Sequence, residues 1–501
     1  MAELAPSRRV RTHLVNEYGE AVRPRRSFLF RLIRALLVLG VVGSVLAAAG
    51  LLWFLHDQQR TPREWAPYLE RRADRHNPVI VGGTALVADY LQRADRLDRA
   101  GEAKVPARIG AGVERSGPLP QERLREVAGI ADLAAAVRSA MPGDVILLLP
   151  GHYRLEGAQM VAAQPGTATA PITVRATRLG DAVLDTRMVV AFKIVAPWWR
   201  FENLVIRGRC DDHRWCEHAF HVAAGATNVV IRNNRLEDLN AQIKVNGERG
   251  QFPDHGLIQG NTLVNTHPRL TTAPITPVDL VAASGWTISD NLIADFVRDG
   301  EGGATYGAFV KGAGEKNIIE RNVVLCEWKL RGVRGQRIGL SLGGGGTGRP
   351  VMRDEGRSGF EQVGGVIRDN LIAFCSDVGI YVNRSARSVI EHNTLLDTAG
   401  IDVRFPESSA EVMYNLVDGV LRPRDGGVIR SRDNEAAMLL GLFLGWHPAR
   451  AHFRNPAMLD LGWTTPPSPV TSDAAGRRDL CGIVRASTPR SGAFEDFAAC
   501  P

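Results

Sequence analysis

Three side chains in the second half of the chain have the chemistry for proton transfer. Lys311 could serve as a general base if burial or nearby cations lower its pKa, or it could neutralise a carboxylate. Tyr306 and Tyr381 could each donate a proton to a leaving oxygen. A solvated strand lysine and two packing tyrosines are the structural alternatives, so burial and neighbours decide between these interpretations.

Two carboxylates suggest a different reaction. Asp279 and Asp402 could act together in hydrolysis, provided that their carboxyl groups lie about 5 to 9.5 Å apart. An arginine two residues after Asp402 makes a structural ion pair the alternative. His218 and His221, beside Glu217, could form an acid–base or metal cluster, but their spacing matches no usual ligand set. We therefore expect a hydrogen-bond network there, with no metal site and no cofactor.

A phrase that recurs from Asn228 to Gly419 indicates what must position these side chains. Each copy has alternating apolar residues, an asparagine and further apolar residues, as in NVVIRNNRLEDL and SVIEHNTLLD. The asparagines are Asn234, Asn261, Asn291, Asn322, Asn370, Asn393 and Asn415, at spacings of 27, 30, 31, 48, 23 and 22 residues. A repeated unit with variable insertions is typical of a solenoid.

The repeats favour strands over helices. Their apolar residues alternate over short runs, and nothing of helical length with a 3.6-residue period appears among them. An asparagine at a corner tolerates left-handed backbone geometry, and stacked asparagines can hydrogen-bond between coils. We therefore predict a β-solenoid in which the asparagines are structural.

Strand alternation predicts two outward columns of side chains on the last strand of each coil. The first column should contain His221, Lys244, Asp279, Phe309, Ser341, Tyr381 and Asp402. The second should contain Asn246, Lys311, Gly343, Asn383 and Arg404. A polymer along the solenoid axis could contact this whole face, so we expect His221, Lys244, Asp279, Asn383, Asp402 and Arg404 to bind substrate.

The N-terminal region predicts a membrane anchor. Residues 1–34 form a basic tail whose eight arginines and three glutamates supply five of the seven net positive charges, so the overall charge does not indicate nucleic-acid binding. Residues 35–55 carry no charge and are long enough for a transmembrane helix. The positive-inside rule then places the N-terminus in the cytoplasm and the main domain in the periplasm or outside the cell. A cleaved signal peptide is the alternative, although the apolar run is too long for one.

Six cysteines fit an oxidising compartment. Cys210 and Cys216 are an easy local pair, and a bond between Cys481 and Cys500 would hold the C-terminus. Cys326 and Cys375 follow repeat asparagines at matching positions, so they could pair between coils or remain small buried residues.

The remaining segments complete the predicted organisation. Residues 56–128 are charged and broken by prolines, which suggests a juxtamembrane stalk, helical around 85–99. A short helix over 130–141 could cap a solenoid spanning 129–435, and residues 436–501 form an extension packed on it. The oversized insertion 331–365 carries arginines and glycines, and is either a basic flap or a disordered loop.

Several phrases together resemble a known family. PGDVILLLPGHYRLEG, PITVRA, WWRFENLVIRG, the repeated asparagines and an ending in GAFE are similar to right-handed parallel β-helix proteins of the pectate-lyase superfamily, nearest to the chondroitinase B and alginate lyase group. The resemblance covers roughly residues 130–497 and implies an all-β, right-handed parallel β-helix. It also implies β-elimination on an acidic polysaccharide, with a lysine base, an arginine acid and a calcium ion.

The site residues match that family only in part. The lysine phrase is matched by Phe309-Val310-Lys311-Gly312, but Gly343 stands where the arginine should fall. Ala304 and Tyr306 replace the calcium-binding acids, so only the lysine carries over.

Three functions therefore remain open for a membrane-anchored β-helix that acts on or binds an acidic polysaccharide. The first is a divergent lyase or epimerase with Lys311 as base. The second is a non-catalytic carbohydrate-binding protein in envelope polysaccharide assembly or export. The third is a glycoside hydrolase that uses paired carboxylates.

Overall fold

The computed structural model describes residues 28–118, 123–157, 159–300, 302–344 and 346–500. Most of the basic tail, residues 1–27, therefore lies outside the described residues. The chain divides into two units, residues 1–58 and residues 59–501.

Helix α1 (Phe28–Gln58) is the described element of the first unit. From Leu29 to Gln58 it is apolar, exposed and 30 residues long. At 1.5 Å per residue it spans about 45 Å, more than the roughly 30 Å of a bilayer's hydrocarbon core. This helix is therefore long and apolar enough to cross a membrane, and it extends the predicted 35–55 span at both ends.

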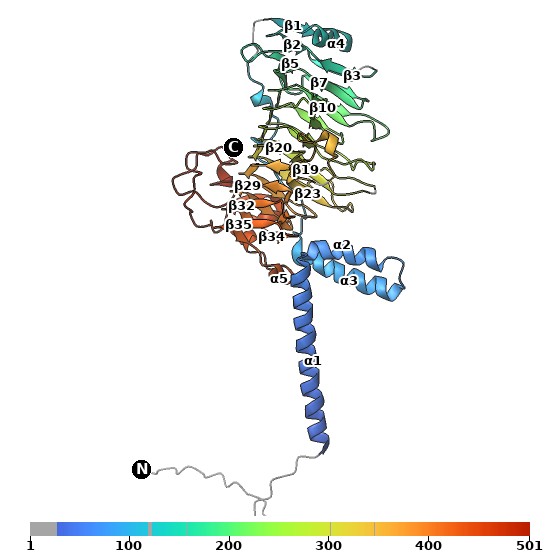
Figure 1. The fold of residues 1–501 in the computed structure, drawn as a ribbon, viewed down its shortest axis with the longest axis vertical. Helices are drawn as coiled ribbons and strands as arrows, with labels where there is room; N and C mark the ends of the chain where they lie inside the picture. Colours follow the sequence, from blue (N-terminus) through green and yellow to red (C-terminus); the bar gives the residue numbers. More distant parts are fainter. Residues whose placement is uncertain (1–27, 119–122, 158, 301, 345, 501) are drawn as a thin grey trace, which may run out of the picture. The chain divides into compact units, whose positions relative to one another are not determined.

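Within the described part of the second unit, three parallel sheets of 12, 10 and 11 strands run along one stacking direction (Figure 1). Sheet 1 comprises, in order, β1 (Leu124–Val127), β2 (Val145–Leu148), β5 (Ile172–Ala176), β8 (Trp199–Glu202), β11 (Val230–Arg232), β14 (Leu257–Gln259), β17 (Thr287–Ser289), β21 (Ile318–Glu320), β25 (Val366–Arg368), β29 (Ser388–Glu391), β32 (Ser409–Met413) and β35 (Val428–Arg432).

Sheets 2 and 3 follow the same order along the chain. Sheet 2 comprises β4 (Met160–Ala162), β7 (Val190–Ile194), β10 (His218–Ala223), β13 (Ile243–Asn246), β16 (Val278–Val281), β19 (Thr305–Lys311), β23 (Arg337–Gly343), β27 (Ile380–Asn383), β31 (Gly400–Arg404) and β34 (Val420–Arg424). Sheet 3 comprises β3 (Gly151–Leu155), β6 (Ala182–Thr186), β9 (Val205–Gly208), β12 (Arg235–Glu237), β15 (Thr262–Val264), β18 (Leu292–Ala294), β22 (Val323–Leu325), β26 (Leu371–Ala373), β30 (Thr394–Leu396), β33 (Leu416–Val417) and β36 (Glu435–Ala436).

The chain visits the three sheets in turn, and each strand pairs in parallel with its counterpart in the next coil. Parallel crossovers of this kind are right-handed in nearly every protein. The fold is therefore a β-solenoid, as the repeats predicted, and it is the right-handed parallel β-helix that the family resemblance implied. A short three-stranded sheet of β20 (Gly314–Glu315), β24 (Gln362–Val363) and β28 (Ser385–Ala386) lies at one corner.

The core consists of inward residues stacked from coil to coil. In sheet 1 the register aligns a column of fully buried isoleucines, and sheet 3 aligns leucine, isoleucine and valine in the same way. The isoleucines are Ile231, Ile258, Ile288, Ile319, Ile367 and Ile390. A β-branched residue packs well on a pleated surface, so these columns stabilise the stack.

The repeated asparagines form the expected ladder between sheets 1 and 3. The side-chain oxygen of Asn261 accepts from the Asn234 backbone N–H at 3.0 Å, and the same bond recurs in each following pair up to Asn415 and Asn434. The left-handed backbone belongs to the residue before each asparagine, for example Asp290 with φ 59°. The expectation that the asparagine itself adopts that geometry is therefore wrong, and its role is hydrogen bonding between coils.

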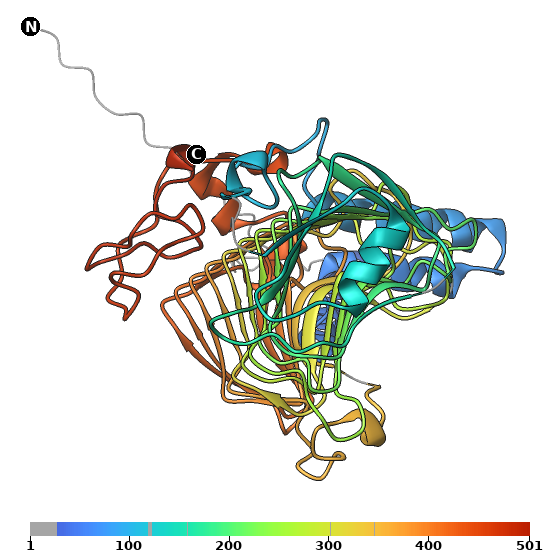
Figure 2. The ribbon, with the colours of Figure 1, turned by 90° about the horizontal axis from the view of Figure 1, so that it is seen from above.

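The first coil is capped and the coils are cross-linked. Helix α4 (Ile130–Arg138) lies over the end of the stack, with Leu133 and Val137 in the core (Figure 2). The disulfides Cys210–Cys216, Cys326–Cys375 and Cys481–Cys500 confirm all three predicted pairs. Cys326–Cys375 connects successive coils, directly after β22 and β26.

Residues 59–118 contain two long helices that the sequence analysis placed only in part. Helix α2 (Pro62–Ala73) begins with proline, and the Thr61 N–H donates to the Glu64 carboxylate at 2.7 Å. Helix α3 (Pro78–Asp95) begins after Asn77, whose side chain accepts from a backbone N–H of the first turn. Proline is favoured in the first helical turn, so the prolines here begin the helices.

The α2–α3 hairpin is bonded to the last coils through buried charges. Arg63 pairs with Asp95 at 2.6 Å and with Asp397 at 3.1 Å, and it also donates to the Cys375 carbonyl at 3.0 Å. Arg422 of β34 pairs with Glu64 at 2.8 Å. The juxtamembrane residues therefore belong to the same compact unit as the coils.

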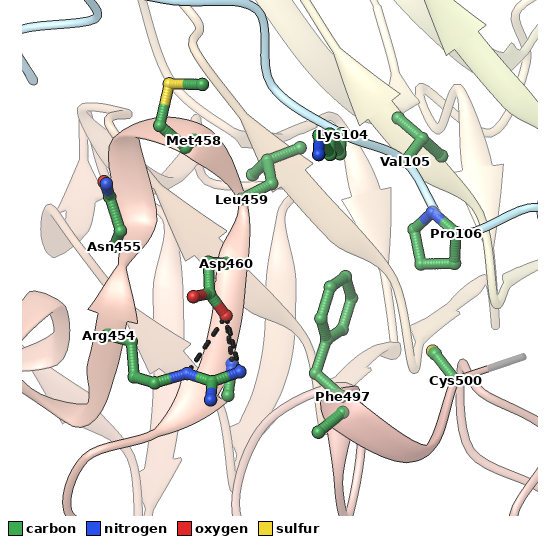
Figure 3. Close-up of a pocket in the computed structure, with 12 residues that line it drawn as sticks. Lys104, Val105, Pro106, Arg454, Asn455, Met458, Leu459, Asp460, Phe497 and Cys500 are labelled. Carbon is green, nitrogen blue, oxygen red and sulfur yellow. Dashed lines mark hydrogen bonds and ion pairs between the residues drawn. The ribbon is translucent and has the colours of Figure 1, made fainter.

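The C-terminal residues pack beside the coils. They include α5 (Leu439–Leu442) and the hairpin β37 (Phe453–Asn455) and β38 (Asp460–Trp463), with short 3₁₀ turns at Pro448–His452, Pro456–Met458 and Phe497–Ala499. Two further 3₁₀ turns lie at Val113–Arg115 and Arg349–Val351. A cavity of about 520 Å³ lies between residues 104–106 and this extension, with Met458, Leu459 and Phe497 on its wall (Figure 3).

Candidate functional site

The outward columns of sheet 2 have the predicted register. His221, Lys244, Asp279, Phe309, Ser341, Tyr381 and Asp402 align strand by strand. Asn246 aligns with Val281 and then Lys311, and Gly343 aligns with Asn383 and Arg404. Burial differs along the columns, because His221, Lys244, Asp279 and Lys311 are half-buried whereas Ser341, Tyr381, Asn383 and Asp402 are buried. The accessible part of this face is therefore its middle, around β13 to β19.

Two lysines and one carboxylate occupy that middle. Lys244 Nζ pairs with Asp279 Oδ2 at 2.6 Å, whereas Asp279 Oδ1 is buried without a hydrogen-bond partner in the structure. The Lys311 ammonium makes no hydrogen bond or ion pair with another described residue, and its neighbour is the Phe309 ring. Burial lowers the pKa of Lys311; Asp279 opposes this shift and Lys244 adds to it. Lys311 is thus the unpaired cation of this group.

Lys311 and Tyr306 both contact the aromatic ring of Phe309. Lys311 Nζ lies 4.3 Å from the centroid of the Phe309 ring, and the Tyr306 ring packs edge-on against the same ring at 5.5 Å. Burial raises the pKa of Tyr306 to about 12, with Tyr381 and Asp377 adding to the shift. Tyr306 therefore keeps its proton at neutral pH, close to an amine whose proton is more weakly held than usual.

Tyr381 and Asn383 lie together on β27, two coils further on from β19. The Tyr381 hydroxyl accepts from the Asn383 amide at 3.1 Å, and burial raises the pKa of Tyr381 although Arg404 opposes the shift. Arg404 pairs with Asp425 at 2.5 Å and stacks over Phe405. Tyr381 and Tyr306 belong to one apolar cluster. Tyr381 and Asn383 are buried whereas Arg404 is half-buried, so Arg404 is the most accessible of the three.

Asp402 is part of a buried ion cluster. Its Oδ2 accepts from Arg422 and from Arg424, each at 3.1 Å. Asp279 and Asp402 lie four strand spacings apart in sheet 2, which is about 19 Å at 4.8 Å per spacing. Because a hydrolytic pair needs carboxyls within about 9.5 Å, these two residues cannot act as that pair. The prediction that Asp279 and Asp402 could act together in hydrolysis required a separation of about 5 to 9.5 Å, and it is therefore wrong.

The histidines form the expected hydrogen-bond network. His221 Nε2 lies 2.6 Å from the Asn246 side-chain oxygen, and His218 Nδ1 lies 2.7 Å from a backbone carbonyl. Burial lowers the pKa of His218 to about 4, and burial likewise raises that of Glu217. Burial also lowers the pKa of His221, so both histidines are neutral at physiological pH. They lie one strand from Lys244 at the edge of the accessible face.

Asp377 is a residue of interest that the sequence reasoning missed. It lies between β26 and β27, and its side chain accepts from the Val378 N–H at 2.8 Å. Burial, then the nearby Glu64 and Asp402 charges, raise its pKa to about 7, while Arg422 opposes the shift. Only the docking of α2 brings Glu64 there, so no local pattern could have indicated this residue.

The insertion 331–365 is anchored over the face. It contains β23, and the Arg353 N–H donates to the Gly312 carbonyl at 2.9 Å. The Arg353 guanidinium pairs with Asp254 and lies 4.3 Å from the Phe252 ring centroid. Glu361 accepts from the Gly312 N–H at 2.9 Å. The described part of this insertion therefore contacts the backbone next to Lys311.

The site does not fit the calcium ion that the family resemblance implied. Ala304 and Tyr306 precede Lys311, and no group of three or more His, Cys, Asp or Glu in the described part of the chain is arranged to hold a metal ion. Gly343 stands where the resemblance implied an arginine that acts as the general acid. Its φ is 77°, and a Cβ there would clash with the Asn383 carbonyl oxygen. This backbone position therefore accepts no side chain.

Of the known proteins compared with this chain, only solved structures match it. No family model matches the chain, and no curated protein matches it. Solved structures do. Pectate lyase Pel9A is 14% identical, with 78% of this chain and 100% of that one covered and a TM-score of 0.46.

Two further structures have lower scores. An alginate lyase from Paenibacillus sp. str. FPU-7 is 15% identical, covering 63% of this chain and 99% of its own, with a TM-score of 0.33. A GH136 lacto-N-biosidase from Eubacterium ramulus is 12% identical, covering 72% and 71%, with a TM-score of 0.42. At these identities a likeness concerns the fold, so function must come from this chain's own residues.

Proposed function

We propose that this protein is a membrane-anchored β-helix that binds an acidic polysaccharide outside the cytoplasm and removes a proton from a uronate unit with Lys311. The observation that carries the proposal is the state of Lys311. It is half-buried, has no ion-pair partner among the described residues and shares the Phe309 ring with Tyr306. A lowered pKa is what a lysine needs in order to act as a base.

The proposed reaction is an elimination in which both proton carriers come from this chain. The neutral Lys311 amine takes the proton from the carbon next to the uronate carboxylate. The electron pair of that C–H bond forms the carbon–carbon double bond as the neighbouring C–O bond breaks, and Tyr306 donates its proton to the leaving oxygen. Lys244 lies two strand spacings from Lys311 in sheet 2 and would supply positive charge for the uronate carboxylate. In an epimerase, Tyr306 would instead return a proton to the opposite face of the same carbon.

A second function has its own supporting observation. The backbone at Gly343 excludes the arginine that the related lyases would place there, and the residues before Lys311 do not fit calcium. Both features favour a non-catalytic carbohydrate-binding protein in envelope polysaccharide assembly or export. Hydrolysis by Asp279 and Asp402 has no such support.

The cellular setting is also part of the proposal. The apolar helix α1 would cross the inner membrane with the arginine-rich tail in the cytoplasm. Residues 59–501 would then lie in the periplasm, where their three disulfides can persist.

Product detection separates the two functions. The full chain in detergent is incubated with alginate, pectate and glycosaminoglycans, and the ultraviolet absorbance of an unsaturated uronate is followed. Lys311→Arg keeps the charge but cannot supply a free base, so we expect it to retain polymer binding and to lose about 10²- to 10⁴-fold in rate. Lys329→Arg, at an exposed lysine paired with Glu102, is the matched control and should leave the rate unchanged.

The outcomes are distinct. No unsaturated product with any polymer, together with retained binding that Lys311→Met weakens, would overturn the lyase and support the binding protein. An epimerase would form no double bond but would exchange the uronate proton with solvent deuterium. Absence of binding to every acidic polymer would overturn both functions.

A further inference from the structure

Helix α3 exposes an unusual amount of apolar surface. From Pro78 to Ala88 it carries no charged residue, and Val79 and Leu86 are 83% and 73% exposed. Ile80, Val81, Val87 and Tyr90 are exposed as well. Scattered apolar residues on a protein surface are ordinary, but a contiguous group of this kind marks an interaction site.

A second segment extends the same apolar surface. Around α5, Met438 and Leu444 are 62% and 82% exposed, and Trp446 is exposed beside them. The Tyr90 hydroxyl donates to the Phe443 carbonyl at 2.8 Å, and His447 lies 2.8 Å from the Ala94 carbonyl. Two segments more than 350 residues apart in the chain are thus held against one another. We call residues 79–90 of α3 together with residues 438–446 the apolar shelf.

The position of the shelf in the chain indicates what covers it. Gln59 follows α1 directly, and α2 begins only three residues later, at Pro62. Those three residues span at most about 11 Å when fully extended. The Gln59 carbonyl and Glu64 are both bonded to Arg422, and α2 packs along α3. If α1 crosses a bilayer, the shelf is therefore tied close to the lipid surface at which α1 ends.

The chemistry of the shelf also fits a lipid surface. Its aliphatic residues would enter the boundary between headgroups and acyl chains, and Tyr90 and Trp446 are the residue types enriched at that level. The other helix of the hairpin, α2, and the turn after it carry the charged and exposed Arg71, Arg72 and Arg75. Exposed apolar residues combined with exposed arginines are typical of segments that lie in the membrane interface.

We propose that the apolar shelf is a second membrane contact, which lies in the outer leaflet of the bilayer that α1 crosses. This inference rests on the proposed membrane anchoring. The bilayer is thus bound by a spanning helix and by a surface of the β-helix unit. The unit would be oriented at the membrane as well as anchored to it.

Site-specific labels in the full chain test this contact. Single cysteines at Val79, Leu86 and Leu444 are labelled with an environment-sensitive fluorophore and reconstituted into phospholipid vesicles with and without nitroxide-bearing lipid. Met141→Cys, at an exposed apolar residue beside the cap helix, is the matched control. Leu46→Cys, within α1, reports separately whether that helix is in the bilayer.

We expect the three shelf labels to show blue-shifted emission and several-fold stronger quenching by nitroxide lipid than the Met141 label. Shelf labels that behave like the Met141 label while the Leu46 label is quenched would overturn the contact and leave the anchor intact. A Leu46 label that lipid nitroxide does not quench would refute the anchor itself, and the contact with it. Blue-shifted shelf labels that lipid nitroxide does not quench would show that protein covers the shelf, and would overturn the proposal.

Discussion

At the scale of single residues, the candidate site is decided by which charges have partners. Lys244, Asp402 and Arg422 are ion-paired, whereas Lys311 has only an aromatic ring beside its ammonium. The sequence could place Lys311 in an outward column, because strand alternation is regular. It could not show that Tyr381 is buried, because its apolar neighbours include Ile338 and Tyr306 of the preceding coils.

The raised pKa of Asp377 leads to a stability prediction. Its folded pKa of about 7 lies above the ordinary value of 3.8, so the folded state binds this proton more tightly than the unfolded state. The contribution to stability is therefore present below about pH 4 and is lost as pH rises towards 7. We take the free energy of unfolding of Asp377→Asn minus that of the wild type. We expect this difference to be more positive at pH 8 than at pH 5, by an amount on the order of 1 kcal/mol or more.

Urea unfolding at the two pH values measures that change. Asp433→Asn, at an exposed carboxylate, controls for the loss of one negative charge. If the free-energy difference between Asp377→Asn and the wild type is the same at both pH values, the Asp377 carboxyl titrates normally in the folded protein.

At the scale of elements, strands and helices differed in how well they could be predicted. The asparagine phrase recurs because each coil needs the same corner, so the coils and their order follow from the sequence. Helix α2 was missed because its charges obscure any apolar period. Two of those charges, Arg63 and Glu64, are buried in ion pairs with residues of the last coils.

The contact between α2 and β34 leads to a second prediction. Arg422 is 3% exposed and binds Glu64 and Asp402, so its loss leaves Glu64 without its counter-charge and leaves the buried Asp402 with Arg424 alone. We expect Arg422→Met to cost about 3 to 5 kcal/mol and to expose residues 59–95 to proteases. Thermal unfolding and limited proteolysis report the two effects.

Arg430→Met is the matched control for that experiment. Arg430 is 82% exposed and lies 3.7 Å from Glu411, so its removal should cost no more than about 1 kcal/mol. Equal effects of the two substitutions would mean that α2 is not held by the buried cluster.

At the scale of the whole molecule, cross-links act on a stack whose coils contact mainly their neighbours. The disulfides close sequence separations of 49, 19 and 6 residues. Loop-closure entropy predicts losses of about 4, 3 and 2 kcal/mol when Cys326–Cys375, Cys481–Cys500 and Cys210–Cys216 are replaced pairwise by alanine. Urea unfolding of the three double variants checks this order, and the reverse order would show that local packing outweighs chain entropy.

A bond between Cys326 and Cys375 could be suggested from their matching places in the repeats, but the docking of residues 59–118 could not be predicted. Those residues have no repeat, and their partners lie as far away as Arg422 and Arg450. Long-range ion pairs leave no periodic signal in a sequence.

The hydrogen bond between Arg422 and the Gln59 carbonyl determines where residue 59 is attached to the stack of coils. Gln59 is the first residue after α1, and its partner Arg422 lies in β34, the last strand of sheet 2. Lys311 lies four strand spacings from β34, about 19 Å along the stack. Lys311 is therefore separated from the attachment point of residue 59 by a fixed number of coils, and adding or deleting one coil between them would change that separation by about 5 Å.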